Sequence, residues 1–136
     1  MLSMSKYSQQ YIDECRAKLE AQVSAYRELT AAVTDRAAVD RFEPVFFNNM
    51  VIVLENYFVH RLRAAEGKNG NPLNEVRMLS TSMLSNNGKL VADKQIRLDP
   101  AKSVLRYAVG DEIRVRETDF DRLCKAFFAD LESKYL

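Results

Sequence analysis

The chain has 136 residues, and 47% of them are hydrophobic, which is enough for one domain with an apolar core of its own. Its 20 basic and 19 acidic side chains give a net charge of +1, so no strong single-sign field points to nucleic acid, a membrane or an acidic partner. No apolar run is long enough for a signal peptide or a membrane-spanning helix. We therefore expect a single domain over residues 1–136, in the cytoplasm and without a membrane partner.

Residues 7–34 carry apolar side chains at a spacing of seven, with no glycine or proline between them. This pattern predicts a long amphipathic helix of about 40 Å, at the usual rise of about 1.5 Å per residue. Two interpretations remain open: part of the helix packs on another subunit, or all of it belongs to the core of a monomeric bundle. The repeating positions are Ile12, Leu19, Tyr26 and Val33, with Cys15 and Leu29 between them.

The most apolar stretch, residues 43–62, lies near the middle of the chain. Asp40, just before it, and Glu43, its first residue, have the spacing of a capping box. Pro44 would then stand in the first helical turn, where a missing N–H is tolerated. Gly67 is typical of the residue that follows a helix end. We therefore predict a second helix from about Asp40 to about Glu66.

Two further helices are predicted from their caps and their apolar spacing. Asn71 and Pro72 are typical of a helix start, and residues 86–88 supply the asparagines and the glycine that end it. Thr118 and Asp121 predict the start of the last helix. The apolar positions are Leu73, Val76, Leu79 and Met83 in the third helix, and Phe120, Leu123, Cys124, Phe127, Phe128, Leu131 and Tyr135 in the last.

Residues 89–117 allow two interpretations. Asp99-Pro100 followed by apolar residues at helical spacing is typical of a short capped helix. Alternatively, apolar and polar residues alternate over 96–115, and Gly110-Asp111 lies where a hairpin turn would be. We favour the hairpin. The predicted fold is therefore mainly α, an antiparallel four-helix bundle with a small β-hairpin or irregular segment before the last helix.

On the predicted second helix, two asparagines, the single histidine and an arginine share one narrow polar stripe, at about 100° per residue. The favoured interpretation is that this stripe faces water, because a helix in a small bundle needs an exposed side. The alternative is a small-molecule or anion pocket between the stripe and the third helix, with the histidine available for proton exchange near neutral pH. The residues of this candidate pocket are Asn49, Asn56, His60, Arg63, Glu75 and Arg77.

The sequence assigns no catalytic residue. General acid–base chemistry at His60 needs a second positioned group, and Glu55 lies more than a right angle away around the helix. A single histidine excludes the usual di-iron pattern of a helical bundle. Cys15 and Cys124 fall on separate apolar faces, so we expect two free thiols rather than a zinc site or a disulfide. We therefore expect no metal and no cofactor, and a non-enzymatic role is favoured.

Four arginines would share the outward face of a sheet if residues 95–116 were strands. Such a face could hold a phosphate or a nucleic-acid backbone, because guanidinium groups bind oxyanions in a forked geometry. A solvated face is favoured instead, since neighbouring Asp99, Asp111 and Glu112 dilute the positive charge. The four residues are Arg97, Arg106, Arg114 and Arg116.

Three short segments have a distinctive sequence: Asn-Pro-Leu-Asn-Glu-Val-Arg at 71–77, Gly-Asp-Glu-Ile at 110–113 and Ala-Phe-Phe-Ala at 126–129. With them the chain resembles a family of short bacterial helical proteins of uncharacterised activity. The resemblance covers roughly residues 43–136 and leaves the first helix unmatched. It implies a helical fold and no activity, cofactor or site residue.

These patterns favour a non-enzymatic helical bundle that acts through self-association, as a dimer, or through a protein partner. The long first helix and the aromatic residues of the second and last helices motivate this hypothesis, because such faces need a partner to bury them. Ligand binding in the His60 pocket is the alternative, and nucleic-acid binding through the arginines ranks third.

Overall fold

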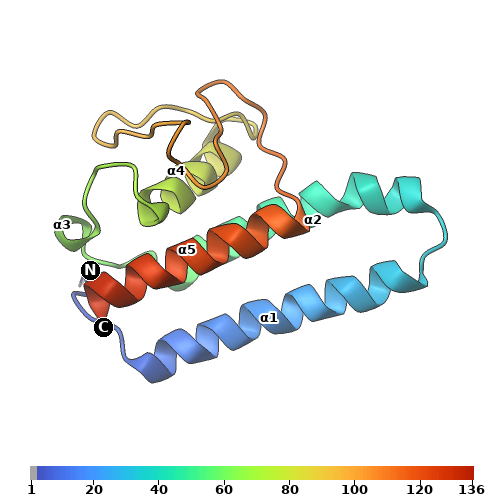
Figure 1. Ribbon diagram of the computed structural model, residues 1–136, viewed down its shortest axis with the longest axis horizontal. Helices are drawn as coiled ribbons and strands as arrows, with labels where there is room; N and C mark the ends of the chain where they lie inside the picture. The colour runs from blue at the N-terminus through green and yellow to red at the C-terminus, as the bar shows by residue number, and fades with distance from the viewer. Residues whose placement is uncertain (1–2) are drawn as a thin grey trace.

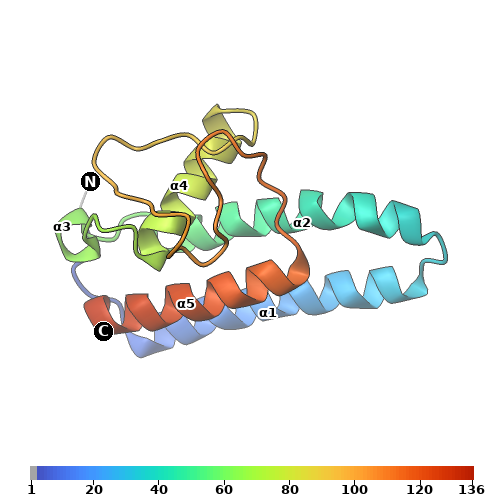
Figure 2. The same ribbon diagram turned by 45° about the horizontal axis from the view of Figure 1, so that its top comes forward.

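The computed structural model describes residues 3–136, and it is mainly helical. Figure 1 shows α1 and α2 as a long hairpin with α5 alongside it, and α4 on the side of α5 that faces away from α1. Figure 2 shows that the tip of this hairpin extends beyond both α4 and α5. The helices are α1 (Gln9–Ala32), α2 (Arg36–Tyr57), the single turn α3 (Arg63–Glu66), α4 (Pro72–Ser85) and α5 (Glu117–Tyr135).

The long helices do not all alternate in direction. Glu43 Oε2 accepts a hydrogen bond from Glu117 N (2.9 Å), and at the other end Tyr135 Oη donates to Leu62 O (2.6 Å), so α2 and α5 run in the same direction. Tyr7 N donates to Tyr135 O (2.7 Å), which places the start of α1 at the end of α5. The prediction of a mainly helical fold is confirmed, but the predicted antiparallel arrangement is wrong for α2 and α5. The parallel pair arises because α4 and a long loop carry the chain back before α5 begins.

α1 begins and ends close to the predicted limits. Ser8 Oγ accepts a hydrogen bond from Tyr11 N (3.1 Å) and caps the helix. The buried residues follow the predicted spacing, with two exceptions: Leu29 is 61% exposed, and Val33 is only half-buried and follows the helix as its C-cap. The buried positions are Ile12, Cys15, Leu19 and Tyr26.

α2 begins earlier than predicted, so the capping-box interpretation was wrong. Asp35 is the N-cap residue, and its carboxylate accepts a hydrogen bond from the first turn (3.2 Å). Pro44 therefore lies inside the helix, where its missing N–H leaves the carbonyl of Asp40 without a helical donor. Arg116 Nη1 donates to Asp40 O (2.9 Å). A cation just before α5 thus supplies the hydrogen bond that Pro44 cannot give to the carbonyl of Asp40.

α2 also ends earlier than predicted, at Tyr57 instead of near Glu66. In the turn that follows, the backbone N–H and Nη1 of Arg61 donate to Phe58 O (3.1 and 3.0 Å). In a continuous helix, Arg61 and Glu55 would lie about 120° apart around the axis. The break brings their side chains together, with Arg61 Nη2 at 2.9 Å from Glu55 Oε1.

The predicted start of α4 is confirmed, whereas the predicted cap of α5 is wrong. Asn71 Oδ1 accepts a hydrogen bond from Asn74 N (2.9 Å), which confirms the predicted cap of α4. α5 begins just before its predicted cap, since Asp119 Oδ2 accepts from Arg116 N (3.0 Å). Thr118 therefore lies in the first turn of α5 and does not cap it.

Residues 86–116 form a loop, and the part of the chain that the structure describes contains no β-hairpin. Its β-pairing consists of two isolated bridges, one of which joins Lys89 to Glu112. Around Asp99, two backbone N–H groups donate to the carbonyl of that residue (both 2.9 Å), forming a turn where the alternative prediction placed a short helix. The predicted hairpin and the predicted helix are both replaced by irregular structure.

The alternation of buried and exposed residues at 113–115 belongs to an extended segment whose partner is a side chain. Ile113 and Val115 are buried, and Arg114 is exposed. Asn48 of α2 donates from Nδ2 to Ile113 O and accepts at Oδ1 from Val115 N, both at 2.9 Å. An amide side chain offers one donor group and one acceptor, as a neighbouring strand would. The extended segment therefore docks on a helix without joining a sheet.

Aromatic side chains pack against one another at both ends of the α1–α2 hairpin. Near the tip, Tyr26 stacks on Phe46 with ring centroids 4.8 Å apart and on Phe42 at 6.1 Å. At the other end, Phe58 meets the edge of Tyr7 at 5.2 Å and lies 5.7 Å from Phe127. Such pairs contribute beyond their buried area. They explain why residues 43–62 form the centre of the core.

Candidate functional site

One face of α2 is open to solvent and carries no charged side chain. Over residues 42–57, the exposed side chains are two apolar residues and two asparagines, with one half-buried isoleucine between them. Phe42 is 42% exposed and Val45 is 56% exposed. All five positions lie within about 80° of one another at about 100° per residue. We call them the α2 face: Phe42, Val45, Asn49, Ile52 and Asn56.

The absence of charge distinguishes this face from the outer side of α1. α1 exposes charged residues along its length, among them Asp13, Glu14 and Lys18. On α2, the two glutamates of the same stretch point elsewhere: Glu43 pairs with Arg116, and Glu55 is buried. Protein–protein interfaces are depleted of charge at their centres and retain aromatic and aliphatic residues. The α2 face therefore has the composition of an interface.

The predicted polar stripe is only partly present. Asn49 and Asn56 are exposed and belong to the α2 face. His60 and Arg63 were placed on the same stripe on the assumption that the helix continued past Tyr57. Because α2 ends there, both residues lie off the stripe, and Arg63 begins α3.

His60 is exposed and lines a hollow of about 470 Å³ at the start of the chain. Tyr57 lies on its wall, and the carbonyl of Tyr57 accepts a hydrogen bond from Tyr11 Oη (2.6 Å). None of the described residues that line this hollow is a carboxylate, so no carboxylate is placed there to act with His60 in acid–base chemistry. The other lining residues are Met4, Tyr7, Ser8 and Tyr11.

Glu75 does not lie beside the predicted stripe. It is buried, and its two carboxylate oxygens accept hydrogen bonds from Val104 N (2.8 Å) and Leu105 N (2.9 Å). Burial raises the pKa of Glu75, and these two N–H groups oppose the rise. Glu75 therefore anchors the 86–116 loop to α4.

Arg77 belongs to a buried ionic network that the sequence prediction missed. Arg77 Nη2 lies 2.6 Å from Glu66 Oε1, and Arg61 Nε lies 2.9 Å from the same oxygen. Arg61 Nη2 also meets Glu55 Oε1 at 2.9 Å. The side chains of Arg61 and Glu66 are both completely buried. Two cations and two anions thus balance inside the protein, as buried charges require.

The environment shifts the pKa values of the network residues in different directions. Burial alone would raise the pKa of Glu66, but the hydrogen bond from Arg77 and the charges of Arg61 and Arg77 lower it below its usual value. For Glu55 burial dominates over Arg61, and its pKa is raised. Burial would lower the pKa of Arg77, but Glu66 and Glu55 raise it. The four side chains pair with one another, and Arg61 and Glu66 do so with no exposure to solvent, which is the arrangement of a structural network.

No local sequence pattern marks this network, because its members come from α2, the turn after it, α3 and α4. Asn74 is also missed: it is buried, and its Nδ2 donates to Glu66 Oε2 (2.7 Å). The one available signal is the presence of Glu55 and Arg61 within the most apolar stretch of the chain. Charged residues in such a stretch are buried only when they are paired.

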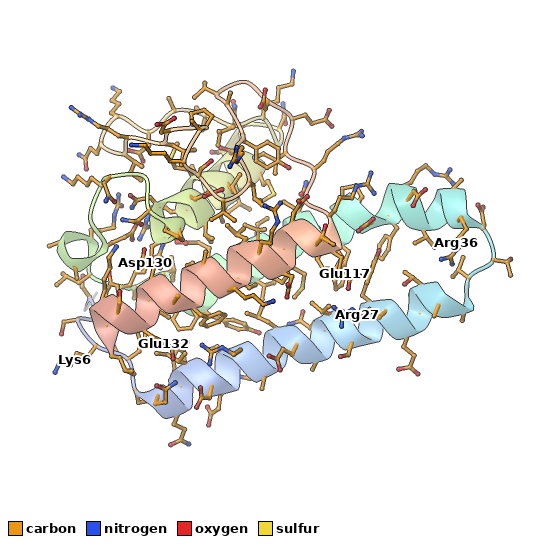
Figure 3. The ribbon with its side chains drawn as sticks, viewed as in Figure 1. Lys6, Arg27, Arg36, Glu117, Asp130 and Glu132 are labelled. Atoms are coloured by element: carbon orange, nitrogen blue, oxygen red, sulfur yellow. The ribbon has the colours of Figure 1, made fainter. Side chains whose placement is uncertain are left out.

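A groove of about 580 Å³, lined by both apolar and charged residues, runs between α1 and α5. Figure 3 shows Arg27 of α1 and Glu117 of α5 near one end of these helices, where they form an ion pair, and Glu132 near the other. There Arg16 Nη2 lies 3.0 Å from Glu132 Oε1. The two ion pairs tie α1 to α5 across the groove. Its apolar residues are Leu19, Val23, Phe120, Cys124, Phe128 and Ala129.

Both cysteines are free, as predicted. Cys15 is buried in the core. Cys124 lines the groove between α1 and α5, and burial, followed by the nearby Asp121 charge, raises the pKa of its thiol to about 12. The thiol is therefore protonated at neutral pH and unreactive.

The four arginines of the predicted basic face do not share a sheet, because residues 95–116 are irregular. Arg116 is engaged with Glu43 (3.0 Å) and with the carbonyl of Asp40. Arg114 is exposed and pairs with Glu112 (3.3 Å). The remaining two, Arg97 and Arg106, are exposed on the loop. Residues 95–116 form no strands, so the four arginines do not line up on one face.

Within residues 3–136, no cluster of three or more histidine, cysteine, aspartate or glutamate side chains has the arrangement needed to hold a metal ion. The same part of the chain contains no helix of sufficient length and apolarity to span a membrane.

Comparisons with protein-family models, with curated proteins and with solved structures give no significant match to this chain.

Proposed function

We propose that this protein is a non-enzymatic four-helix bundle that works by binding another protein chain through the α2 face. The observation that carries the proposal is the composition of that face: over residues 42–57 every exposed side chain is apolar or an amide. Water-facing helix surfaces normally carry charge, and α1 in this chain does so. A surface that lacks charge over four helical turns has the character of an interface centre.

The exposed apolar area decides between the α2 face and the groove. The groove between α1 and α5 is lined mostly by charged and polar residues, and its largest apolar residues, Leu19, Phe120 and Phe128, are already buried, at 3%, 4% and 4% exposure. Phe42 and Val45 of the α2 face are 42% and 56% exposed, so a partner would remove far more apolar surface from water there. The α2 face is therefore the better binding surface.

Ligand binding beside His60 ranks below this function, because the other members of the predicted pocket lie elsewhere and Arg77 is committed to Glu66. Nucleic-acid binding ranks third, since Arg114 and Arg116 pair with Glu112 and Glu43. The resemblance to short bacterial helical proteins remains a prediction and adds no activity to either alternative.

Photo-crosslinking in the cells that contain this protein tests the proposal. A photoreactive phenylalanine analogue replaces Val45 on the α2 face, and the same analogue replaces Ala21, which is exposed on α1, as the matched control. We expect light-dependent adducts with a protein chain from position 45 and few from position 21. Equal, low yields at both positions would contradict a binding role for the α2 face.

A further inference from the structure

The residues of the α2 face follow one another at alternating spacings of three and four. Phe42, Asn49 and Asn56 are seven apart, and so are Val45 and Ile52. This is the a/d spacing of two helices that pack side by side with interlocking side chains. Phe42 and the asparagines occupy the a positions, and Val45 and Ile52 occupy the d positions. β-Branched residues at d alone favour three or four chains, so the asparagines at a carry the preference for two.

We propose that the partner of the α2 face is the same face of a second copy of this chain, with the two α2 helices parallel about a two-fold axis along the seam. The inference rests on the proposed function and specifies its partner. In such a pair each residue of the seam meets its own copy. The face is therefore required to be complementary to itself.

The asparagines meet that requirement. A primary amide carries both a donor and an acceptor, so Asn49 pairs with Asn49 of the second copy, and Asn56 likewise. In this chain Asn49 Nδ2 donates to Val45 O (2.8 Å), which leaves its second N–H and its Oδ1 available. An asparagine at an a position is also a known means of setting the register and the number of chains in parallel helix pairs.

The relative direction of the two α2 helices follows from the residues at the a and d positions. In a parallel pair a meets a and d meets d, so amides lie against amides, and Ile52 lies against Ile52. In an antiparallel pair a meets d, and each asparagine would lie against Val45 or Ile52 with its polar atoms unpaired. Buried unpaired amides are costly, so the parallel arrangement is favoured.

The charge distribution agrees with a two-fold pair. Any charge on the seam would meet an identical charge of the second copy, and like charges brought together in an interface are strongly unfavourable. The seam contains no charge from Phe42 to Asn56. It is only about four helical turns long, so we expect a weak dimer that dissociates on dilution.

Sedimentation equilibrium of the full chain tests this inference. The wild-type protein should show a monomer–dimer equilibrium, and Asn49→Glu should weaken it at least about 10-fold, because two carboxylates would then face each other. Asn49→Lys should do the same. An equimolar mixture of the two variants should restore association, since residue 49 meets its own copy. Circular dichroism of each variant confirms that it is folded.

The matched controls are Ala21→Glu and Ala21→Lys on the exposed side of α1, which should leave the dimer unchanged. A wild-type chain that stays monomeric at every concentration would overturn the inference. Adducts to a different protein from position 45 would still uphold the proposed function in that case. A dimer that Asn49→Glu leaves intact would place the contact elsewhere. A dimer lost in each variant but not restored in the mixture would exclude the parallel register.

Discussion

At the scale of single residues, side chains in this protein carry out tasks that backbone groups perform in more regular folds. The guanidinium of Arg116 donates to the carbonyl of Asp40, which has no helical donor because of Pro44. The amide of Asn48 hydrogen-bonds an extended segment in the way that a neighbouring strand would. Arg61 links Glu55, Glu66 and the carbonyl of Leu73 (3.0 Å). Each of these side chains binds a backbone or charged group that regular secondary structure leaves without a partner.

Replacing Glu66 by glutamine tests the buried network. The change keeps the shape of the side chain but removes the negative charge that Arg61 and Arg77 share, so a buried cation is left uncompensated. We expect the free energy of unfolding to fall by about 3–5 kcal/mol, the cost of breaking a buried ion pair by removing one partner. Urea denaturation followed by circular dichroism measures it.

The matched control for this prediction is Glu112→Gln. Glu112 pairs with Arg114, but both side chains are more than 60% exposed. Solvent screens such a pair, so the substitution should leave the midpoint of unfolding almost unchanged. A loss at Glu66 no larger than the loss at Glu112 would show that the network does not stabilise the fold.

At the scale of elements, the 86–116 loop is irregular but is held to the helices at several points. Glu75 of α4 binds the backbone at 104–105, and Asn48 of α2 binds it at 113–115. The loop also packs against the turn before α4, where Arg97 N donates to Lys68 O (3.0 Å). A segment without regular hydrogen bonding stays ordered only through such contacts.

Alanine substitutions at two glycines test how tightly the loop docks. Gly70 has a φ of +83°, and a Cβ there would lie 2.2 Å from the carbonyl oxygen of Arg97. Gly88 has a similar φ of +76°, but nothing lies within 4 Å of its Cβ position. Both substitutions place alanine in the left-handed region, at a cost of about 1 kcal/mol. Gly70→Ala must also displace the loop.

We therefore expect Gly70→Ala to lower the free energy of unfolding by about 1–3 kcal/mol more than Gly88→Ala. Thermal unfolding of the two variants provides the comparison, and hydrogen exchange should show faster exchange around Arg97 in Gly70→Ala only. Equal losses of stability in both variants would mean that the loop moves aside at little cost.

At the scale of the whole molecule, the buried carboxylates make stability depend on pH in opposing ways. The pKa of Glu66 is lowered in the folded protein, so its contribution is fully present above its usual value of 4.5 and is lost as pH falls through the lower folded value. The pKa values of Glu55 and Glu75 are raised, so burying their charges reduces stability once pH rises above 4.5.

Comparison of the wild-type protein with Glu66→Gln isolates the first of these effects. A protonated Glu66 resembles glutamine, so the difference in unfolding free energy between the two proteins should be largest near neutral pH and shrink as pH falls below 4.5. Urea titrations at a series of pH values measure the difference. A gap that stays constant into the acid range would mean that the charge of Glu66 is not what stabilises the network.

The sequence by itself determined the helices wherever local signals agree. The seven-residue spacing predicted α1, Asn71 with Pro72 predicted the start of α4, and the aromatic stripe predicted the course of α5. The apolar character of residues 43–62 predicted that α2 would lie at the centre of the core. These features depend on neighbouring residues in the chain and on the burial of one face, which periodicity records.

Tertiary structure alone decided the boundaries of α2, the form of residues 86–116 and the membership of the buried network. Pro44 lies inside α2, and Arg116, distant in sequence, supplies the donor that the proline lacks. α2 ends at Tyr57 where Arg61 turns inward to meet Glu55 and Glu66. The candidate site shows the same division: Asn49 and Asn56 were found from their spacing, but His60 and Arg63 were separated from them by that break. Partners far apart in sequence leave no local pattern, so only the folded chain reveals them.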